Sequence, residues 1–279
     1  MPEFRRDRSV EPITVSRNPA FPVHAGKSFV VTGAAGGVGR ALSELLIAEG
    51  ARVVLADIDK AEVDQLATAL GGDEAGVHAV ELNLLDQDSI GAAVASCLSH
   101  LGRIDGLANV AGVVKMAPAL SHTRELWDLQ FGVNVFGTFE LTKEIAQHMA
   151  DGGHGGAIVN VASEAGKVGH PNMLAYNASK AAVINITRVL AVELAPHHIN
   201  VNCVAPGGVD TPMLHDVADK FGEMADASSS DIFTYMANEQ LGRHIAPVEV
   251  AVAISFLLGN RVQAIRGVTL NVDGGVTPY

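Results

Sequence analysis

The sequence predicts an α/β domain built on one doubly wound parallel sheet of about seven strands, with helices on both faces. The first observation is a regular alternation of short apolar runs with segments of helical periodicity from residue 27 onward. The second is that these runs are apolar throughout rather than at every other position, which is typical of strands covered on both faces. The third is length, since 279 residues fit one large domain and nothing in the chain marks a second.

The expected elements follow one another along the chain. Apolar runs predict strands at 28–32, 52–56, 77–82, 104–109, 156–162, 199–205 and 268–272. Helical periodicity predicts helices at 37–49, 60–70, 87–100, 124–150, 174–195 and 247–258. Residues 210–246 interrupt this order and predict one or two short helices, which follow directly on a Pro-Gly segment.

Residues 1–25 differ from the rest of the chain. Pro2, Pro12, Pro19 and Pro22 break any helix there, and the charges are mixed. We interpret this segment as an extended N-terminal arm, which is either a disordered tail or an arm that covers a neighbouring subunit.

Composition excludes several classes of function. The chain has 31 acidic and 19 basic residues, and this formal net charge of −12 argues against binding to nucleic acids or anionic membranes. No stretch approaches the ~20 apolar residues of a membrane span, and no apolar segment of a signal peptide follows the N-terminal arginines. Cys97 and Cys203 are interpreted as small buried thiols in a reducing cytosol. We therefore expect a cytoplasmic protein. No His, Cys and carboxylate cluster has metal-site spacing, so we expect no metal.

A glycine-rich loop joins the first expected strand to the first helix, with the sequence Thr-Gly-Ala-Ala-Gly-Gly-Val-Gly at 32–39. Such glycines let the backbone turn tightly and approach a pyrophosphate, which then rests on the helix N-terminus. The context supports this interpretation, because an apolar run precedes the loop, a periodic segment follows it, and Asp57 closes the next strand. The loop therefore predicts a dinucleotide site.

A phenol and an ammonium group are expected on one face of a helix, because Tyr176 and Lys180 lie four residues apart. A lysine beside a phenol favours the phenolate, so we expect Lys180 to lower the pKa of Tyr176. A phenol that ordinarily titrates near ~10 then becomes a usable acid and base at neutral pH. Ser163 lies thirteen residues before the tyrosine.

In these features the chain resembles the short-chain dehydrogenase/reductase family, over roughly residues 26–276. The loop at 32–39 matches the family's Thr-Gly-x-x-x-Gly-x-Gly pattern, and the stretch at 109–112 matches its Asn-x-Ala-Gly element. The stretch at 206–211 matches its Pro-Gly segment beside the nicotinamide. The family's catalytic tetrad is matched in order and spacing by Asn134, Ser163, Tyr176 and Lys180.

The resemblance implies a Rossmann-type NAD-binding catalytic domain over 26–279, in which 210–246 is a mobile lid that shapes the substrate pocket. It also implies the residues that bind the cofactor: Gly33, Gly37, Val38, Gly39, Asp57, Ile58, Asn83, Leu84, Asn109, Ala111, Gly112, Tyr176, Lys180, Pro206, Gly207, Val209 and Thr211.

The implied reaction is hydride transfer between a nicotinamide and a secondary alcohol or ketone. Tyr176 would donate or accept the proton, and Lys180 would also hydrogen-bond the nicotinamide ribose. Ser163 would hydrogen-bond the substrate oxygen as charge develops on it. Asn134, a poor residue for the helix interior in which it is expected, would hold a water that relays protons.

Asp57 predicts NAD rather than NADP as the cofactor. An acid at the end of the second strand accepts hydrogen bonds from the adenosine ribose hydroxyls and repels a 2′-phosphate. No basic residue stands in the glycine loop or just after this strand, where Ile58 follows, and Arg40 lies past the last glycine. Asn83 replaces an aspartate usual in the family, and its oxygen can still pair with the adenine amino group.

The substrate stays open at this point. The leading interpretation is an NAD-dependent alcohol dehydrogenase or ketone reductase acting on CH–OH groups. A partly apolar substrate of small to medium size is indicated by Met213, Leu214, Phe221 and Met224 in the lid. Candidates are a cyclic or aliphatic secondary alcohol, a hydroxysteroid, or a small diol or polyol. The alternatives are a 3-oxoacyl-thioester reductase that uses NADPH and, from another class, a non-catalytic dinucleotide sensor.

Two further candidates for substrate contact, Glu164 and His170, lie between Ser163 and Tyr176. In the resembling family this segment borders the substrate. None of the other histidines lies in this segment.

The helices expected at 174–195 and 247–258 also predict assembly. Apolar residues spread around most of the circumference of each, whereas the surface helix of a monomer would show one apolar stripe. Burial on two sides therefore indicates that another subunit covers the outer faces. Since the family's usual tetramer packs through the equivalent helices, we expect a homotetramer.

Overall fold

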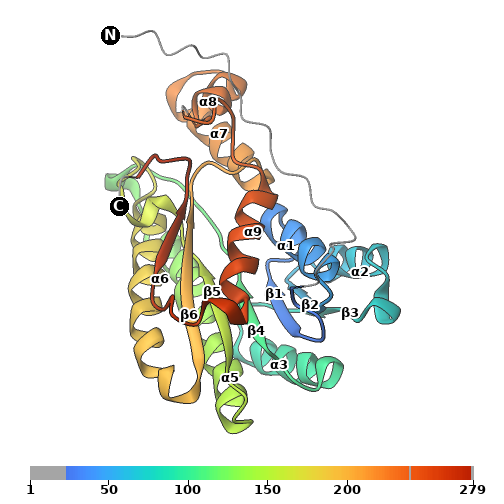
Figure 1. Cartoon of the computed structure of the whole chain (residues 1–279). Helices are drawn as coiled ribbons and strands as arrows, with labels where there is room; N and C mark the ends of the chain where they lie inside the picture. Colours follow the sequence, from blue (N-terminus) through green and yellow to red (C-terminus); the bar gives the residue numbers. More distant parts are fainter. Residues whose placement is uncertain (1–22, 239, 278–279) are drawn as a thin grey trace.

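The computed structural model describes residues 23–238 and 240–277, and in this part of the chain seven strands form one parallel sheet (Figure 1). The strand order is β3-β2-β1-β4-β5-β6-β7, so the order reverses between β1 and β4. The strands are β1 (Ser28–Thr32), β2 (Arg52–Asp57), β3 (Val77–Glu81), β4 (Gly106–Asn109), β5 (Gly156–Val161), β6 (Ile199–Pro206) and β7 (Thr269–Val272). They are the predicted strands with small shifts at their ends, and the predicted fold class is confirmed.

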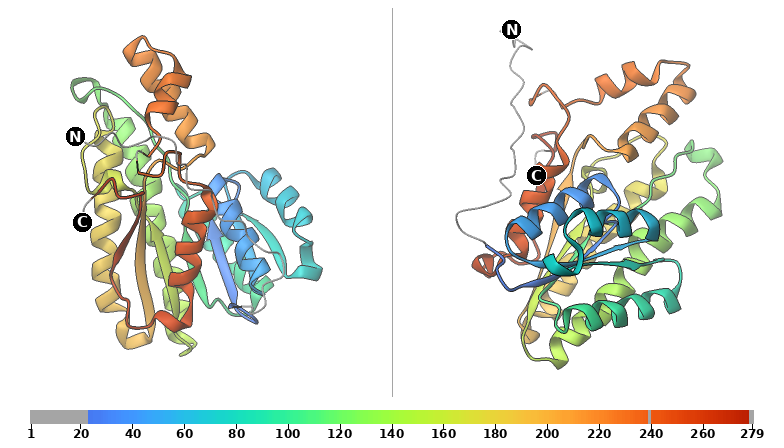
Figure 2. Two further views of the ribbon diagram at one scale, coloured as in Figure 1. Left: turned by 45° about the horizontal axis from the view of Figure 1, so that its top comes forward. Right: turned by 90° about the vertical axis from the view of Figure 1, so that its right-hand side faces the viewer.

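Helices cover both faces of the sheet, as Figure 2 shows from two further directions. One face carries α1 (Gly37–Ala48), α2 (Lys60–Ala69) and α9 (Pro247–Leu258), and the other carries α3 (Gln87–Leu101), α5 (Thr138–Asp151) and α6 (Leu174–Glu193). Along β2, Val53 and Leu55 pack into the first of the two apolar clusters, while Val54 and Ala56 pack into the second. Successive strand residues point to opposite faces, which explains why the strands are apolar at every position.

The long helix predicted over 124–150 is interrupted, and this prediction is corrected. It divides into α4 (Arg124–Phe131), a π-helical turn (Gly132–Gly137) and α5. At the turn the backbone passes very close to the loop that follows β3. A Cβ added to Gly137 would lie 2.0 Å from the carbonyl oxygen of Leu84, and one added to Gly132 would lie 2.5 Å from the Leu85 side chain. The π turn therefore lies where two segments are in close contact.

A chain of buried polar side chains ties the middle strands to two helices. Asn109 Nδ2 at the end of β4 donates to Thr142 Oγ1 and to Asn160 Oδ1, both at 2.8 Å. Asn160 Nδ2 on β5 in turn donates to Thr187 Oγ1 on α6 at 2.9 Å. Because buried polar groups are costly when unpaired, this chain fixes how β4, β5, α5 and α6 meet.

The predicted N-terminal arm lies mostly outside the described residues, since residues 1–22 fall there. His24 belongs to the arm range and is buried against the domain, with its ring 4.8 Å from that of Phe29. His24 Nε2 lies 3.1 Å from Ser255 Oγ, which donates to Glu49 Oε2 at 2.5 Å. These contacts join the segment before β1 to the C-terminal ends of α1 and α9.

The insertion predicted at 210–246 forms two helices, α7 (Pro212–Ala225) and α8 (Ser229–Tyr235), which project beyond the carboxyl ends of the strands (Figures 1 and 2). The ring of Phe233 on α8 lies between two imidazoles, 4.1 Å from His215 and 4.0 Å from His244. A β-bridge between Val209 and Ile245 closes the base of the insertion. The insertion is thus attached to the domain at both of its ends.

Within the described residues no helix is long and apolar enough to cross a membrane, and no three His, Cys, Asp or Glu side chains are grouped to hold a metal ion.

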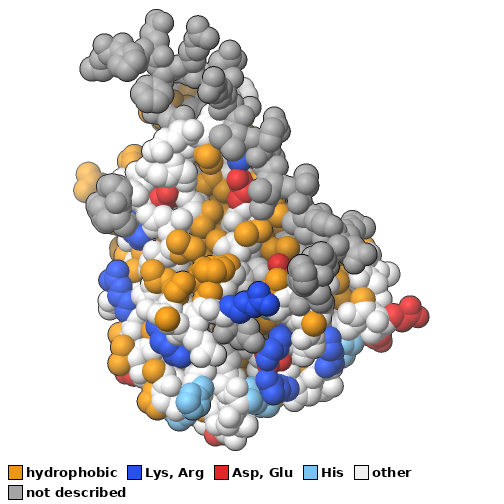
Figure 3. All heavy atoms as spheres, viewed as in Figure 1, with side chains coloured by type: hydrophobic (Ala, Val, Ile, Leu, Met, Phe, Trp, Pro, Cys, Tyr) orange, Lys and Arg blue, Asp and Glu red, His pale blue; other side chains and the backbone are white. Residues whose placement is uncertain are grey.

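Hydrophobic side chains are exposed on helices for which the sequence predicts a subunit interface. Figure 3 shows such side chains across the face on which α9 lies in Figure 1. Phe256 of α9 is 51% exposed, and Val192 of α6 is 74% exposed.

Candidate active site

A continuous cleft runs along the carboxyl edge of the sheet, from the end of β2 to α7, past the reversal of strand order between β1 and β4. Ligands of open α/β sheets bind at this position. The predicted cofactor residues that line the cleft are Gly33, Gly37, Val38, Gly39, Asp57, Ile58, Asn83, Leu84, Ala111, Gly112, Tyr176, Lys180, Pro206, Gly207, Val209 and Thr211. Asn109 does not line the cleft, because its side-chain amide donates hydrogen bonds to the buried side chains of Thr142 and Asn160. Of the predicted tetrad, Ser163, Tyr176 and Lys180 line the cleft.

The glycine loop fits a pyrophosphate. Gly33 has a φ of +64°, and a Cβ there would lie 2.7 Å from Ala111 Cα. The helix α1 begins at Gly37 after a glycine N-cap, so no side chain binds its first backbone N–H groups, and its first turn has no acid. A Cβ on Gly37 would lie 2.7 Å from Thr211 Cγ2 on the opposite wall. The loop therefore leaves space and free N–H donors where an anionic group can bind.

The end of the cleft beside β2 is acidic. Asp57 Oδ2 accepts a hydrogen bond from Ala35 N at 3.0 Å, which ties the end of β2 to the glycine loop. Asp59 and Glu62 line the same end. Arg40, the nearest base predicted from sequence, donates to Glu62 at 2.5 Å and does not line the cleft. Among the described residues that line the cleft, Lys180 at the other end is the only lysine or arginine.

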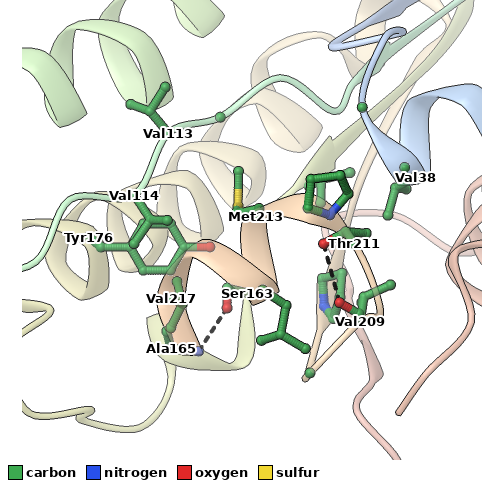
Figure 4. Close-up of a pocket in the computed structure, with 18 of the residues that line it drawn as sticks. Val38, Val113, Val114, Ser163, Ala165, Tyr176, Val209, Thr211, Met213 and Val217 are labelled. Atoms are coloured by element: carbon green, nitrogen blue, oxygen red, sulfur yellow. Dashed lines mark hydrogen bonds between the residues drawn. The ribbon is translucent and has the colours of Figure 1, made fainter. Parts of the chain in front are cut away.

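At the other end, α6 presents the predicted proton-transfer groups. Figure 4 shows Tyr176 and Ser163 around the same cavity as Met213 and Val217 of α7. Lys180 Nζ lies 5.8 Å from the centre of the Tyr176 ring and donates to the carbonyl oxygen of Val161 at 2.9 Å. The helix therefore holds the phenol and the amine side by side, as the four-residue spacing predicts.

Burial governs the ionisation of both groups. Lys180 is 4% exposed, and desolvation lowers its pKa from 10.5 to about 8. Burial also raises the pKa of Tyr176, although a hydrogen bond from Ser163 acts in the opposite direction. The prediction that Lys180 lowers the pKa of this phenol is therefore wrong for the protein alone. Desolvation disfavours the charged form of each group and is the largest influence on both pKa values.

Asn134 lies behind the cleft wall, within the π turn, and is 1% exposed. Its Oδ1 accepts from Val113 N at 2.8 Å, and its Nδ2 donates to Val113 O at 2.9 Å and to Ser179 Oγ at 3.0 Å. A Cβ added to Gly112 would lie 3.3 Å from Asn134 Oδ1 and 3.2 Å from Lys180 Nζ. The amide oxygen and the lysine thus face the same small space beside Gly112.

The lid gives the substrate end of the cleft an apolar wall. Met213, Leu214 and Phe221 line the cleft as predicted, whereas Met224 does not. Sequence reasoning missed Val217, which lies one helical turn after Met213 on the same face of α7, and this spacing could have revealed it. It also missed Val114, which no motif marks.

Comparison with known proteins agrees with this geometry. A model of the short chain dehydrogenase family matches residues 27–221. A 3-oxoacyl-acyl-carrier-protein reductase of Thermotoga maritima is 37% identical over 251 residues, which cover 90% of this chain and 98% of that protein. A D-threitol dehydrogenase of Mycolicibacterium smegmatis is 36% identical over 252 residues, or 90% of this chain and 93% of that protein.

A solved structure shows the same fold with a dinucleotide. The 3-ketoacyl-acyl-carrier-protein reductase of Brucella melitensis, complexed with NADH, superposes with a TM-score of 0.78 at 33% identity, covering 90% of this chain and 98% of that one. The chain belongs to the short-chain dehydrogenase/reductase family. It is an oxidoreductase that acts on an alcohol or ketone group with a nicotinamide dinucleotide.

The lowered pKa of Lys180 predicts a pH-dependent difference in stability between the wild-type protein and Lys180→Met. Below pH 8 the lysine is charged in the folded and the unfolded chain, so the full cost of burying the charge opposes folding. Between pH 8 and pH 10.5 the folded protein releases the proton first, and this cost disappears. The free energy of unfolding of the wild type should therefore rise relative to that of the variant by about 3 kcal/mol across this window.

Urea unfolding followed by tryptophan fluorescence, at a series of pH values, measures this difference. Tyr176 and both cysteines are present in the two proteins, so their titration cancels from the comparison to first order. A difference that does not change with pH would mean that Lys180 keeps its ordinary pKa in the folded protein.

Proposed function

We propose that the chain is an NAD-dependent dehydrogenase that oxidises a secondary alcohol, and that it reduces the corresponding ketone in the reverse direction. The observation that carries the choice of NAD is the acidic end of the cleft, where Asp57, Asp59 and Glu62 meet. A carboxylate accepts hydrogen bonds from the ribose hydroxyls, whereas a 2′-phosphate would be repelled by the charges of Asp57 and Asp59. Arg40 is paired with Glu62, and no lysine or arginine lines this end of the cleft among the described residues.

The proposed roles of the side chains follow from their positions. When bound, the nicotinamide accepts or supplies the hydride. Tyr176 exchanges the proton of the substrate hydroxyl, and Ser163 hydrogen-bonds the substrate oxygen beside it. Lys180 binds the ribose and, with Asn134, connects the buried phenol to the space beside Gly112. The shared cleft supports the roles of Tyr176, Ser163 and Lys180, and the family's tetrad pattern supports all four.

A second candidate function is the NADPH-dependent reduction of a 3-oxoacyl thioester. It is supported by the 37% identity to the Thermotoga maritima reductase, which spans nearly the whole of that protein. The acidic adenosine end counts against it, although the Brucella melitensis reductase was solved with NADH. Kinetics with both cofactors and both substrate classes separate the two candidates.

Replacing Tyr176 with phenylalanine tests the proposed chemistry. The ring and its packing remain while the exchangeable proton is lost, so kcat should fall by about 10²- to 10⁴-fold. NAD binding, measured by titration calorimetry, should change little, which separates loss of chemistry from loss of fold. Turnover that survives in the variant would exclude Tyr176 as the proton carrier. Binding of NAD without turnover of any alcohol or ketone by the wild type would favour a dinucleotide sensor.

Replacing Asp57 with serine tests the choice of cofactor. The loss of a charged acceptor should lower kcat/KM for NAD by about 10- to 100-fold and raise it for NADP. Asp64→Ser is the matched control, because this exposed acid on α2 pairs with Lys60 and does not line the cleft. Initial rates with both cofactors provide the measurement. A wild-type preference for NADP would contradict the proposal directly.

We also propose that the protein is cytoplasmic and assembles as a homotetramer through α6 and α9. Support comes from apolar side chains on the outer faces of these helices, among them Val189 and Val192 on α6 and Val252 and Phe256 on α9. Side chains of this kind rarely face water in contiguous groups unless a partner covers them. The buried free thiols Cys97 and Cys203 agree with a reducing compartment.

Phe256→Asp tests the assembly. A charge placed in an apolar interface is desolvated without a partner, so the variant should lose the tetramer at concentrations where the wild type keeps it. Light scattering coupled to size exclusion gives the mass of each. Ala95→Asp, an exposed substitution on α3, is the control and should leave the mass unchanged. A monomeric wild type would contradict the proposal.

A further inference from the structure

A buried carboxylate stands next to the catalytic serine, and the roles assigned above do not use it. Glu164 begins a short 3₁₀ turn directly after Ser163 and lines the cleft. Its side chain is only 15% exposed. Oε1 lies 3.2 Å from His170 Nε2, at ion-pair distance. Glu164 Oε2 and His170 Nε2 are both buried and have no hydrogen-bond partner among the described residues. Buried polar atoms are nearly always paired, so this oxygen indicates a missing donor.

His170 explains how the carboxylate is held. It lines the same cleft, and the neighbouring carboxylate of Glu164 raises its pKa, so the imidazolium and the carboxylate stabilise each other. The pair lies on the segment between Ser163 and Tyr176. The charge of Glu164 also raises the pKa of Tyr176, which places the carboxylate within electrostatic reach of the reacting phenol.

The group that would donate to this oxygen of Glu164 can be described by its chemistry. A carboxylate only accepts hydrogen bonds, so its partner must carry an O–H or N–H group. The hydroxyl that is oxidised is already engaged by Tyr176 and Ser163. A simple secondary alcohol has no other donor, and a 3-oxoacyl thioester has no hydroxyl beside its ketone. A second hydroxyl next to the reacting carbon would meet this requirement.

We propose that the free oxygen of Glu164 accepts a hydrogen bond from a second hydroxyl of the substrate, so that the enzyme selects vicinal diols and polyols. This inference rests on the proposed function and names the substrate class of the same site. His170 is the positioning residue that holds Glu164. In the reaction the reacting carbon gives its hydride to NAD, the hydroxyl on it gives its proton to Tyr176, and a ketone forms. The second hydroxyl is unchanged, so the product is a hydroxyketone.

Matched pairs of alcohols test the inference. Isopropanol and propylene glycol share the same secondary carbinol, and only the second carries the neighbouring hydroxyl; cyclohexanol and its vicinal diol form a larger pair. We expect kcat/KM with NAD to be about 10- to 100-fold higher for each diol than for its mono-alcohol. In Glu164→Ala this ratio should approach one, mainly through loss of diol turnover. Glu164→Gln keeps an acceptor oxygen without the charge and should keep an intermediate ratio.

Two controls separate a contact from a general defect. Glu62→Ala removes a carboxylate at the adenosine end of the same cleft and should change the rates of both alcohols by the same factor. The pH profile of kcat/KM for the mono-alcohol reports whether Glu164→Ala acts only by shifting the pKa of Tyr176. In that case both alcohols would follow the shift together.

The outcomes are distinct. A diol preference that disappears in Glu164→Ala supports the inference. An equal loss of kcat/KM for both alcohols in Glu164→Ala, or no diol preference in the wild type, overturns the inference. If NAD-dependent turnover is still observed, the proposed function stands. Preference for isopropanolamine over propylene glycol also overturns it, because the carboxylate would then bind an ammonium. No NAD-dependent turnover of any alcohol overturns the proposed function and this inference together.

Discussion

The carboxamide of Asn134 joins the segments that build the active site, and the geometry of the site depends on it. It makes two hydrogen bonds with the backbone of Val113, in the segment after β4, and one with Ser179 on α6. Ser179 immediately precedes Lys180, and its hydroxyl donates in turn to the carbonyl oxygen of Tyr176. One buried side chain therefore sets the position of the helix that carries the proton-transfer groups against the wall of the cofactor cleft.

The burial that fixes this geometry also sets its chemistry. Lys180 and Tyr176 are each driven toward their neutral forms, the amine by a lowered pKa and the phenol by a raised one. Lys180 keeps its charge at neutral pH, below its pKa of about 8. In a desolvated site a further positive charge would favour the phenolate more strongly than it does in water. In the proposed mechanism, a cationic ring held beside Tyr176 would therefore lower the pKa of the phenol.

Local patterns predicted the strands, the glycine loop and the Tyr-Lys pair, because apolar runs, turn glycines and helical spacing act over a few residues. Features that depend on distant contacts were not predictable. The π turn at 132–137 lies where Gly137 approaches Leu84, and the Asn109 amide is hydrogen-bonded to Thr142 and Asn160 instead of lining the cleft. The pKa of Tyr176 was predicted in the wrong direction, because sequence spacing reports the neighbouring lysine but not the desolvation of both groups.

The substrate end of the cleft has a polar wall and an apolar wall, and the two are attached to different parts of the fold. The polar wall, with Glu164 and His170, lies in the segment between β5 and α6, which also carries Ser163. The apolar wall belongs to α7, which is attached through the Val209–Ile245 bridge and the stack of Phe233 between two imidazoles. Because α7 and Glu164 belong to separate segments, a rearrangement of α7 would change the volume of the pocket and need not move the carboxylate. Orientation of a polar substrate would then come from the sheet side and size selection from the lid, so the two properties can vary independently.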